Sequence, residues 1–225
     1  LKIPPSGAMV LGSAYHEAVA QGYRHKLSTN EQAPAELLND TFDTSFERIK
    51  SEHLVKEEED ELPFDEIVRD EEPGKLKDVG IKLVETYREK VMPTITPITV
   101  EDRIETKIGD VDMVMITDLV TPNTIVDHKV KSRRFSEDDL KQDIQATAYS
   151  LALGKPLEFH VALKTVKPEV VVQQTARTDE DKAFFIRQVE QIYKAIQAGV
   201  FYPNTSGWWC NEKWCGYYQL CRKKP

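Results

Sequence analysis

Two aspartates in apolar, strand-like surroundings are the residues of this chain best suited to carry chemistry. Asp112 opens one apolar run, and Asp127 closes another fifteen residues later. Burying a carboxylate costs free energy unless a partner or a metal offsets its charge. Side chains alternate along a strand, so Lys129 shares a face with Asp127 while His128 points the other way. Two carboxylates holding a divalent metal, with an ammonium group beside it, could hydrolyse a phosphodiester. An ordinary Asp–Lys ion pair at a strand end is the simpler alternative.

Four short motifs follow one another around these carboxylates. They are Gly12-Ser13-Ala14-Tyr15-His16-Glu17, Gly109-Asp110-Val111-Asp112, Ile125-Val126-Asp127-His128-Lys129 and Gln145-Ala146-Thr147-Ala148-Tyr149. In this order they resemble the RecB-like branch of the PD-(D/E)XK nuclease superfamily, which includes phage-type and CRISPR-associated exonucleases. Each motif is weak alone, and it is their order that makes the resemblance specific.

The resemblance implies a metal site with a role for each residue. Asp112 and Asp127 would bind the metal, and the main-chain carbonyl of His128 would complete part of its coordination. Lys129 would orient the attacking water and stabilise charge on the phosphate. His16 would be a further metal ligand, although a purely structural helix histidine is the alternative. Carboxylates suit Mg²⁺ and imidazole suits Mn²⁺ better, so we expect Mg²⁺ or Mn²⁺.

Other acidic side chains compete for a place in this site. The family carries an acidic residue on the preceding strand, which Glu101 or Glu105 could supply. Asp110 and Asp118 are further candidates, but their expected positions fit less well.

A second set of candidates lies on the helix expected after the Asp–His–Lys motif. Gln145 and Tyr149 are four residues apart and share one helix face, together with Lys141. The resemblance implies that these side chains contact the substrate backbone or the catalytic lysine. An ordinary half-exposed helix face is the alternative.

The periodicity of the sequence predicts a helical N-terminal region followed by an α/β core. Helices are expected over 12–25, 38–54, 76–91, 136–151 and 179–197, and strands over 98–108, 111–120, 123–130, 157–163 and 169–174. The resemblance implies a restriction-endonuclease-like fold, in which a mixed central sheet is flanked by helices and joined to an N-terminal helical lobe. We expect one nuclease domain over 1–225, composed of a helical region over 1–95, a catalytic core over 96–200 and a cysteine-bearing tail over 201–225.

The net charge of −8 neither supports nor excludes nucleic acid as a ligand. Acidic residues concentrate in 57–72, which we interpret as a solvated segment, whereas basic residues cluster in 129–134 and 222–224. No stretch approaches the ~20 apolar residues of a membrane span, and no signal peptide is visible. We therefore expect a cytoplasmic protein without a membrane partner. The chain opens at Leu1 rather than Met, so we expect residues ahead of it to be missing.

All three cysteines lie in the tail, at Cys210, Cys215 and Cys221. An odd number argues against a secreted disulfide framework. Thiolates grouped in this way suit a [4Fe–4S] cluster or a zinc site. In iron–sulfur members of the resembled family a fourth cysteine precedes the histidine helix, and here it would lie upstream of Leu1. Three reduced cysteines packed among aromatic side chains are the alternative.

The resemblance implies a metal-dependent DNA exonuclease in phage or bacterial recombination, repair or CRISPR adaptation. Its substrate would be DNA, and a helicase or a recombination or CRISPR protein would be its partner. A non-catalytic DNA-binding or assembly module and a structure-specific endonuclease are the alternatives. The intact Asp112, Asp127 and Lys129 argue against the non-catalytic module, since a decayed site need not keep them.

Overall fold

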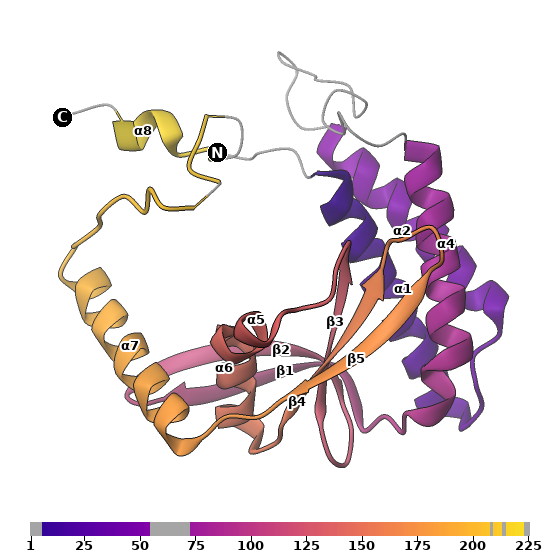
Figure 1. The fold of residues 1–225 in the computed structure, drawn as a ribbon, viewed down its shortest axis with the longest axis horizontal. Helices are drawn as coiled ribbons and strands as arrows, with labels where there is room; N and C mark the ends of the chain where they lie inside the picture. The colour runs from indigo at the N-terminus through magenta and orange to yellow at the C-terminus, as the bar shows by residue number, and fades with distance from the viewer. Residues whose placement is uncertain (1–5, 55–72, 208, 213–214, 223–225) are drawn as a thin grey trace.

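Three long helices form the N-terminal region of the chain and pack against one another (Figure 1). The computed structural model describes residues 6–54, 73–207, 209–212 and 215–222. The helices are α1 (Gly7–Thr29), α2 (Ala35–Leu54) and α4 (Pro73–Lys90), followed by the short η1 (Met92–Thr94). The Ser6 side chain caps α1 by accepting from Met9 N, and Asn30 ends the helix in the left-handed conformation. The acidic segment 57–72 lies outside the described residues.

A five-stranded mixed sheet follows, with its strands in chain order from one edge to the other. The strands are β1 (Thr99–Ile108), β2 (Val111–Val120), β3 (Ile125–Lys131), β4 (Leu157–Leu163) and β5 (Glu169–Thr175). The pair β3–β4 is parallel and the other pairs are antiparallel. A parallel pair needs a crossover, which α5 (Glu137–Gln142) and α6 (Ile144–Leu153) provide. Next come α7 (Asp179–Gln197) and, in the tail, α8 (Tyr218–Arg222).

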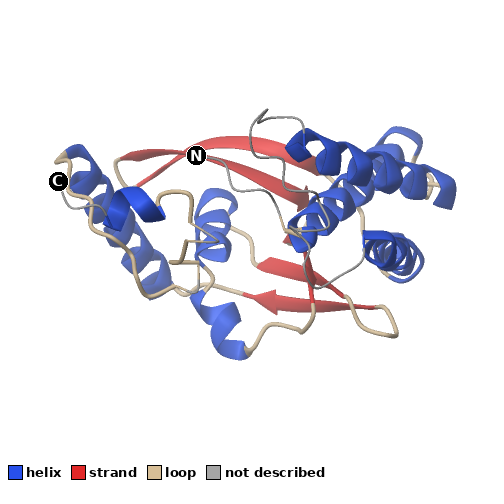
Figure 2. Cartoon of the chain, turned by 90° about the horizontal axis from the view of Figure 1, so that it is seen from above, coloured by secondary structure: helices blue, strands red, loops and turns tan. Residues whose placement is uncertain are grey.

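Helices cover both faces of the sheet, and each face has its own apolar core (Figure 2). On one face, α1, α2 and α4 pack against strand residues that include Leu119, Val126 and Ala162. On the other face, α6 and α7 pack against residues that include Ile125 and Phe159. Neighbouring residues of β3 therefore contribute to opposite cores, as strand alternation requires. The fold class expected from the sequence is confirmed.

The crossover between β3 and β4 differs from the single helix that the sequence predicts. The helix breaks at Asp143, which has an extended backbone and caps α6 by accepting from Ala146 N. Arg177 stabilises the break, because its guanidinium donates to the carbonyls of Leu140 and Asp143. Ile144 lies in the first turn after the break and is 68% exposed. No helix in the described residues is both long and apolar enough to span a membrane.

Candidate active site

The polar site lies where β2 and β3 separate. These strands pair through Leu119↔Val126 and Val120↔Ile125 and through no further residue pair. Continuing that register places Asp118 opposite Asp127, one position beyond the last pair. Two carboxylates from different strands therefore meet at the opening of a fork. The short turn at Thr121–Thr124 fixes this register, with Thr121 N donating to the Thr124 carbonyl.

Three nitrogens approach one oxygen of Asp118. The main-chain N–H of His128 donates to Oδ2 at 2.7 Å, and His128 Nδ1 lies 3.4 Å from the same atom. His16, on α1, places its Nδ1 3.4 Å from Oδ2 as well. A carboxylate only accepts, so both imidazoles must direct an N–H at it. His16 Nε2 is then left with a free lone pair, which is the state of a metal-binding imidazole held by a carboxylate.

Asp127 lies across the fork from Asp118 on β3. It is almost fully buried, with 1% of its side chain exposed. Lys129 Nζ lies 2.7 Å from Asp127 Oδ2, but this oxygen has no aligned hydrogen bond from any described residue. The ammonium also donates to Gln145 Oε1 at 3.2 Å. An ion pair without an aligned hydrogen bond leaves a buried carboxylate oxygen open to a cation.

Helix α6 holds the lysine's second partner in place. Gln145 Nε2 donates to Tyr149 Oη at 2.8 Å, and the Tyr149 hydroxyl donates to the Ile116 carbonyl of β2 at 2.5 Å. Because the amide nitrogen of Gln145 donates to Tyr149, the amide presents its oxygen to Lys129. Of the two functions that the resemblance implies for Gln145, the structure shows the contact with Lys129.

The charges of the site act on one another strongly. Burial raises the pKa of Asp127 to about 6, with Lys129 opposing the rise and Asp118 adding to it. Burial would also raise the pKa of Asp118, but the hydrogen bonds and charges of His128 and His16 hold it well below its usual value. For His16, burial is the largest influence and would lower the pKa. The hydrogen bond and charge of Asp118, together with the charge of Asp127, outweigh it and leave the pKa raised.

Among the described residues, no three His, Cys, Asp or Glu side chains form a group that could hold a metal ion as they stand. The donor set nevertheless fits Mg²⁺ or Mn²⁺, since these ions keep several waters and need only one or two carboxylates. The buried, unaligned oxygen of Asp127 and the free Nε2 of His16 are the atoms that fit such an ion.

Several residues predicted for the site lie elsewhere. Asp112 is six residues before Asp118 on β2, which is about 20 Å along a strand. Its side chain is 85% exposed and pairs with Lys107 across the hairpin at 2.7 Å. The structure therefore does not bring Asp112 to Asp127, and Asp118 occupies the place expected for it. Lys141 lies on α5, beyond the break, and its 4.0 Å pair with Glu137 is exposed.

Of the remaining acidic candidates, Glu101 lies beside the fork and Glu105 does not. Glu101 continues the β1–β2 register opposite Asp118 and has a positive φ of 49°. Its carboxylate pairs with Arg24 of α1. Glu105 pairs with Arg103 on an exposed stretch of β1, and Asp110 lies in the exposed turn of the β1–β2 hairpin.

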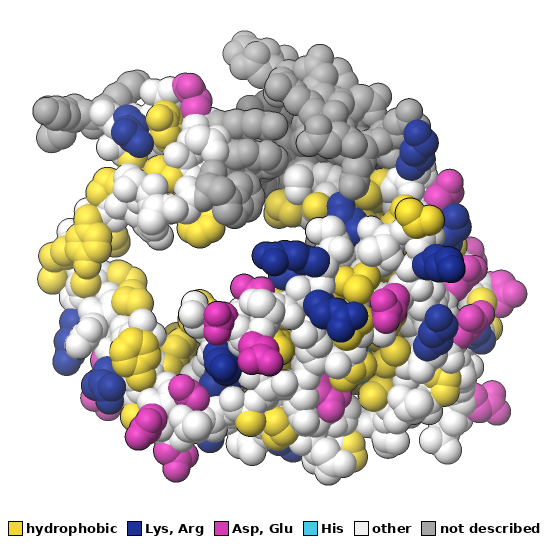
Figure 3. Space-filling model, viewed as in Figure 1, with side chains coloured by type: hydrophobic (Ala, Val, Ile, Leu, Met, Phe, Trp, Pro, Cys, Tyr) yellow, Lys and Arg dark blue, Asp and Glu magenta, His cyan; other side chains and the backbone are white. Residues whose placement is uncertain are grey.

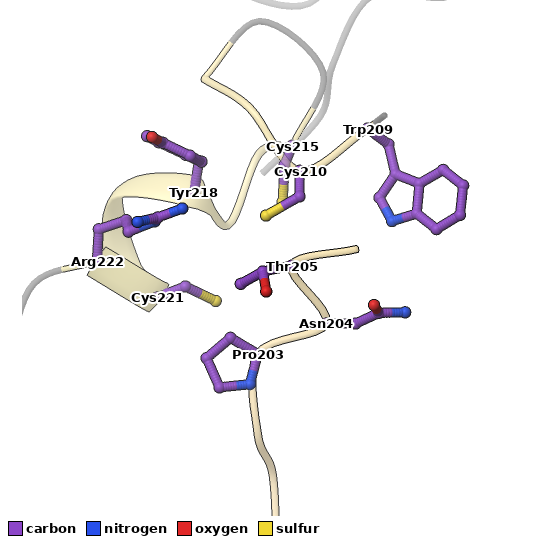
Figure 4. Close-up of a pocket in the computed structure, with 9 residues that line it drawn as sticks. All are labelled: Pro203, Asn204, Thr205, Trp209, Cys210, Cys215, Tyr218, Cys221 and Arg222. Atoms are coloured by element: carbon purple, nitrogen blue, oxygen red, sulfur yellow. The ribbon is translucent and has the colours of Figure 1, made fainter. Parts of the chain in front are cut away.

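The three cysteines of the tail line one cavity of about 360 Å³ and are free thiols (Figure 4). The other lining residues are Pro203, Asn204, Thr205, Trp209, Tyr218 and Arg222. In Figure 4 the sulfur of Cys221 points into the space that Cys210 and Cys215 also border. The three cysteines thus border one cavity, but neither by themselves nor with any other described residue do they form a group that could hold a metal ion as they stand.

A mixed sheet between two helical layers, carrying an Asp-x-Lys motif on its central strand, defines a restriction-endonuclease-like α/β protein. The profile of the PD-(D/E)XK nuclease superfamily matches residues 2–222, and the chain belongs to that superfamily. The recognition made from the sequence is thereby confirmed. Nucleases of this superfamily generally use Mg²⁺ or Mn²⁺.

A solved structure supports the fold. A protein from Eubacterium rectale described as a "Putative exonuclease" superimposes with a TM-score of 0.50 at 16% identity, covering 98% of this chain and 89% of that one. At this identity the likeness shows a shared fold. Comparison with curated proteins finds no match.

Proposed function

We propose that this nuclease is a metal-dependent DNA exonuclease whose site is formed by His16, Asp118, Asp127 and Lys129. The meeting of Asp118 and Asp127 at the β2–β3 fork, with His16 beside them, is the observation that carries the proposal. Asp118 takes the role that the sequence suggested for Asp112. The main-chain carbonyl of His128 remains a proposed ligand, since it follows Asp127 on the same strand.

The metal would supply positive charge and a water of lowered pKa at the site. Asp127 and Asp118 would hold it through carboxylate oxygens and His16 through Nε2. Lys129 would then be freed from neutralising Asp127, because the metal would take over that role. Gln145, fixed by Tyr149, would keep the ammonium directed to the site, where it stabilises charge on the phosphate. Lys141 is a more distant candidate for contact with the DNA backbone.

The surroundings of the site support a DNA substrate. Figure 3 shows an open space between the body of the molecule and the region formed by α7 and the tail, with Lys and Arg side chains beside it. Lys131 lies in β3 two residues beyond Lys129, and its ammonium rests 3.8 Å from the Phe135 ring centroid. Positive charge next to a metal site suits a polyanion, and a space open at both sides suits a chain rather than a small ligand.

Cleavage of matched DNA forms tests the proposal. We expect end-labelled linear single- or double-stranded DNA to be degraded with Mn²⁺ or Mg²⁺, and covalently closed circles of the same sequence to stay intact. Linearised circles would show an endonuclease instead, and DNA binding without cleavage in either metal would show a non-catalytic module. Lys129→Met should abolish cleavage yet keep Mn²⁺ affinity in calorimetry. Wild-type cleavage by this variant would contradict the role of the lysine.

A setting in recombination, repair or CRISPR adaptation, with a helicase or similar partner, belongs to the proposal and rests on the family alone. For the tail we propose a [4Fe–4S] cluster with a fourth cysteine upstream of Leu1, or a zinc ion, supported by the shared cavity of the three thiols. Anaerobic purification of a chain extended at its N-terminus tests it. Bound iron with absorbance near 400 nm supports the cluster, stoichiometric zinc supports the second form, and neither metal contradicts both.

A further inference from the structure

A buried group of four polar rings lies next to the site, on the face of the sheet that α1, α2 and α4 cover. Tyr87 Oη of α4 is at its centre, 2.8 Å from Tyr23 Oη, 2.9 Å from His128 Nε2 and 2.8 Å from His160 Nδ1. Tyr87 and Tyr23 are fully buried, as is His160, and His128 is 3% exposed. Such a network is costly to bury unless every member has a partner. The contacts of its rings can be followed to Asp118.

The path begins at Asp118, which only accepts. His128 must therefore carry its proton on Nδ1, the nitrogen that faces Asp118 Oδ2. The other ring nitrogen, Nε2, lies 2.9 Å from Tyr87 Oη, the only described hydroxyl hydrogen-bonded to it. The Tyr87 oxygen is also within hydrogen-bond distance of Tyr23 Oη and His160 Nδ1, and His160 Nε2 lies 3.4 Å from Glu158 Oε2.

The hydrogen bond between Tyr87 and Nε2 therefore holds the orientation of the His128 ring. The opposite tautomer would set a lone pair of Nδ1 against the Asp118 carboxylate. With the observed orientation, Nδ1 and the main-chain N–H of His128 both hold Oδ2 of Asp118. No described residue contacts Oδ1, which remains available at the fork.

We propose that Tyr87 is a positioning residue that acts through His128 to orient the Asp118 carboxylate for the metal. The inference rests on the proposed function, because it assigns Asp118 to the metal site. Tyr87 touches neither substrate nor metal, and its contribution reaches the site through two hydrogen-bonded groups. Partners of this kind commonly change metal affinity about tenfold to a hundredfold when removed.

Mn²⁺ binding measured by calorimetry tests the inference with a matched pair of variants. Tyr87→Phe removes the hydroxyl that holds His128, whereas Tyr23→Phe removes an identical buried hydroxyl one bond further from the site. We expect Tyr87→Phe to raise the Mn²⁺ Kd about tenfold or more, and Tyr23→Phe to change it less than twofold. Cleavage by Tyr87→Phe should recover towards the wild-type kcat at saturating Mn²⁺. An equal loss of affinity in the two variants would overturn the inference, since it would reflect stability alone.

A second variant, His128→Phe, tests the path on its own if Tyr87→Phe does not fold. It keeps an aromatic ring but removes Nδ1 and Nε2, and it should raise the Mn²⁺ Kd about tenfold or more. Unchanged affinity would overturn the inference. Where Tyr87→Phe folds, adding it to His128→Phe should cause no further loss, because its path through His128 is already broken. Additive losses would overturn the inference.

A metal-free readout separates this inference from the proposed function. Two-bond ¹H–¹⁵N spectra of the histidine rings should show His128 protonated on Nδ1, with its Nε2 signal displaced in Tyr87→Phe. An Nε2-protonated His128 in the wild type would overturn the inference whatever the metal data show. If the wild-type protein binds no Mn²⁺, both the proposed function and the inference fail. If the wild type binds and Tyr87→Phe binds equally well, only the inference fails.

Discussion

At the scale of single residues, the proposed site includes a carboxylate, Asp118, that local motif spacing did not single out. The sequence placed Asp112 with Asp127 because Gly109-x-x-Asp112 matched the order of the motifs. The structure pairs Asp118 with Asp127, since the turn at Thr121–Thr124 sets the register of β2 against β3. Counting back across that turn from Asp127 would have found Asp118. His16, Asp127, Lys129 and Gln145 could be proposed from the motifs, because the order of the motifs along the chain is specific.

The two aspartates of β2 give a matched test of this assignment. We expect Asp118→Asn to lower the cleavage rate by at least a hundredfold, because it removes the negative charge proposed to bind the metal. Asp112→Asn, on the same strand but 85% exposed and paired with Lys107, should cleave within about twofold of the wild type. Rates on linear DNA at fixed Mn²⁺ measure both. A large loss of cleavage in Asp112→Asn, with little loss in Asp118→Asn, would instead assign the catalytic role to Asp112.

Asp127 should destabilise the fold when no metal is bound. Its pKa is raised to about 6, so the folded state holds a proton that the unfolded state releases near pH 4. Stability of the metal-free protein therefore falls as pH rises from about 4 through 6, by roughly 1–3 kcal/mol from this group. We expect Asp127→Asn to unfold at a higher temperature than the wild type at pH 7.5 in EDTA. The gap should close near pH 4.5, and a variant less stable at both values would contradict the assignment.

At the scale of secondary structure, periodicity predicted most of the helices and strands to within a few residues. The predicted strand 111–120 and helix 179–197 match β2 and α7 at both ends. The break between α5 and α6 was missed partly because a distant residue stabilises it. Arg177 reaches back 34 and 37 positions to the Asp143 and Leu140 carbonyls, a contact that no local pattern reports. The break separates Lys141 from Gln145, which is why the predicted shared face does not form.

Arg177 is therefore expected to control the geometry of the crossover. Its guanidinium also donates to the Thr147 and Thr175 hydroxyls, and the residue is 9% exposed. Arg177→Lys keeps the charge but cannot make the same set of bonds. We expect it to lower the free energy of unfolding by about 2–4 kcal/mol in urea titration, through carbonyls left without donors. Arg187→Lys on the exposed side of α7 is the control and should change stability by less than about 0.5 kcal/mol.

At the scale of the whole molecule, the body and the tail contribute differently to stability. Among the described residues, the buried apolar side chains lie between Val10 and Leu163, while those of the tail are exposed or half-buried. In Figure 1 the tail runs away from the end of α7 and returns towards the N-terminal side without covering the sheet. The fold of the body could be predicted because apolar periodicity encodes both of its cores. The path of the tail could not, since its described aromatic and apolar side chains stay largely exposed and join neither core.

Removing the tail should consequently leave the body intact. We expect a chain ending at Gly199 to melt within about 3 °C of the full chain in EDTA, because no core residue is lost. Its Mn²⁺ affinity at the β2–β3 fork should also be unchanged, since His16, Asp118 and Asp127 all lie in the body. Any iron or zinc held by Cys210, Cys215 and Cys221 should disappear with the tail. A fall of more than about 10 °C would show instead that the tail belongs to the folded core, and loss of Mn²⁺ binding would place a ligand of the catalytic metal within it.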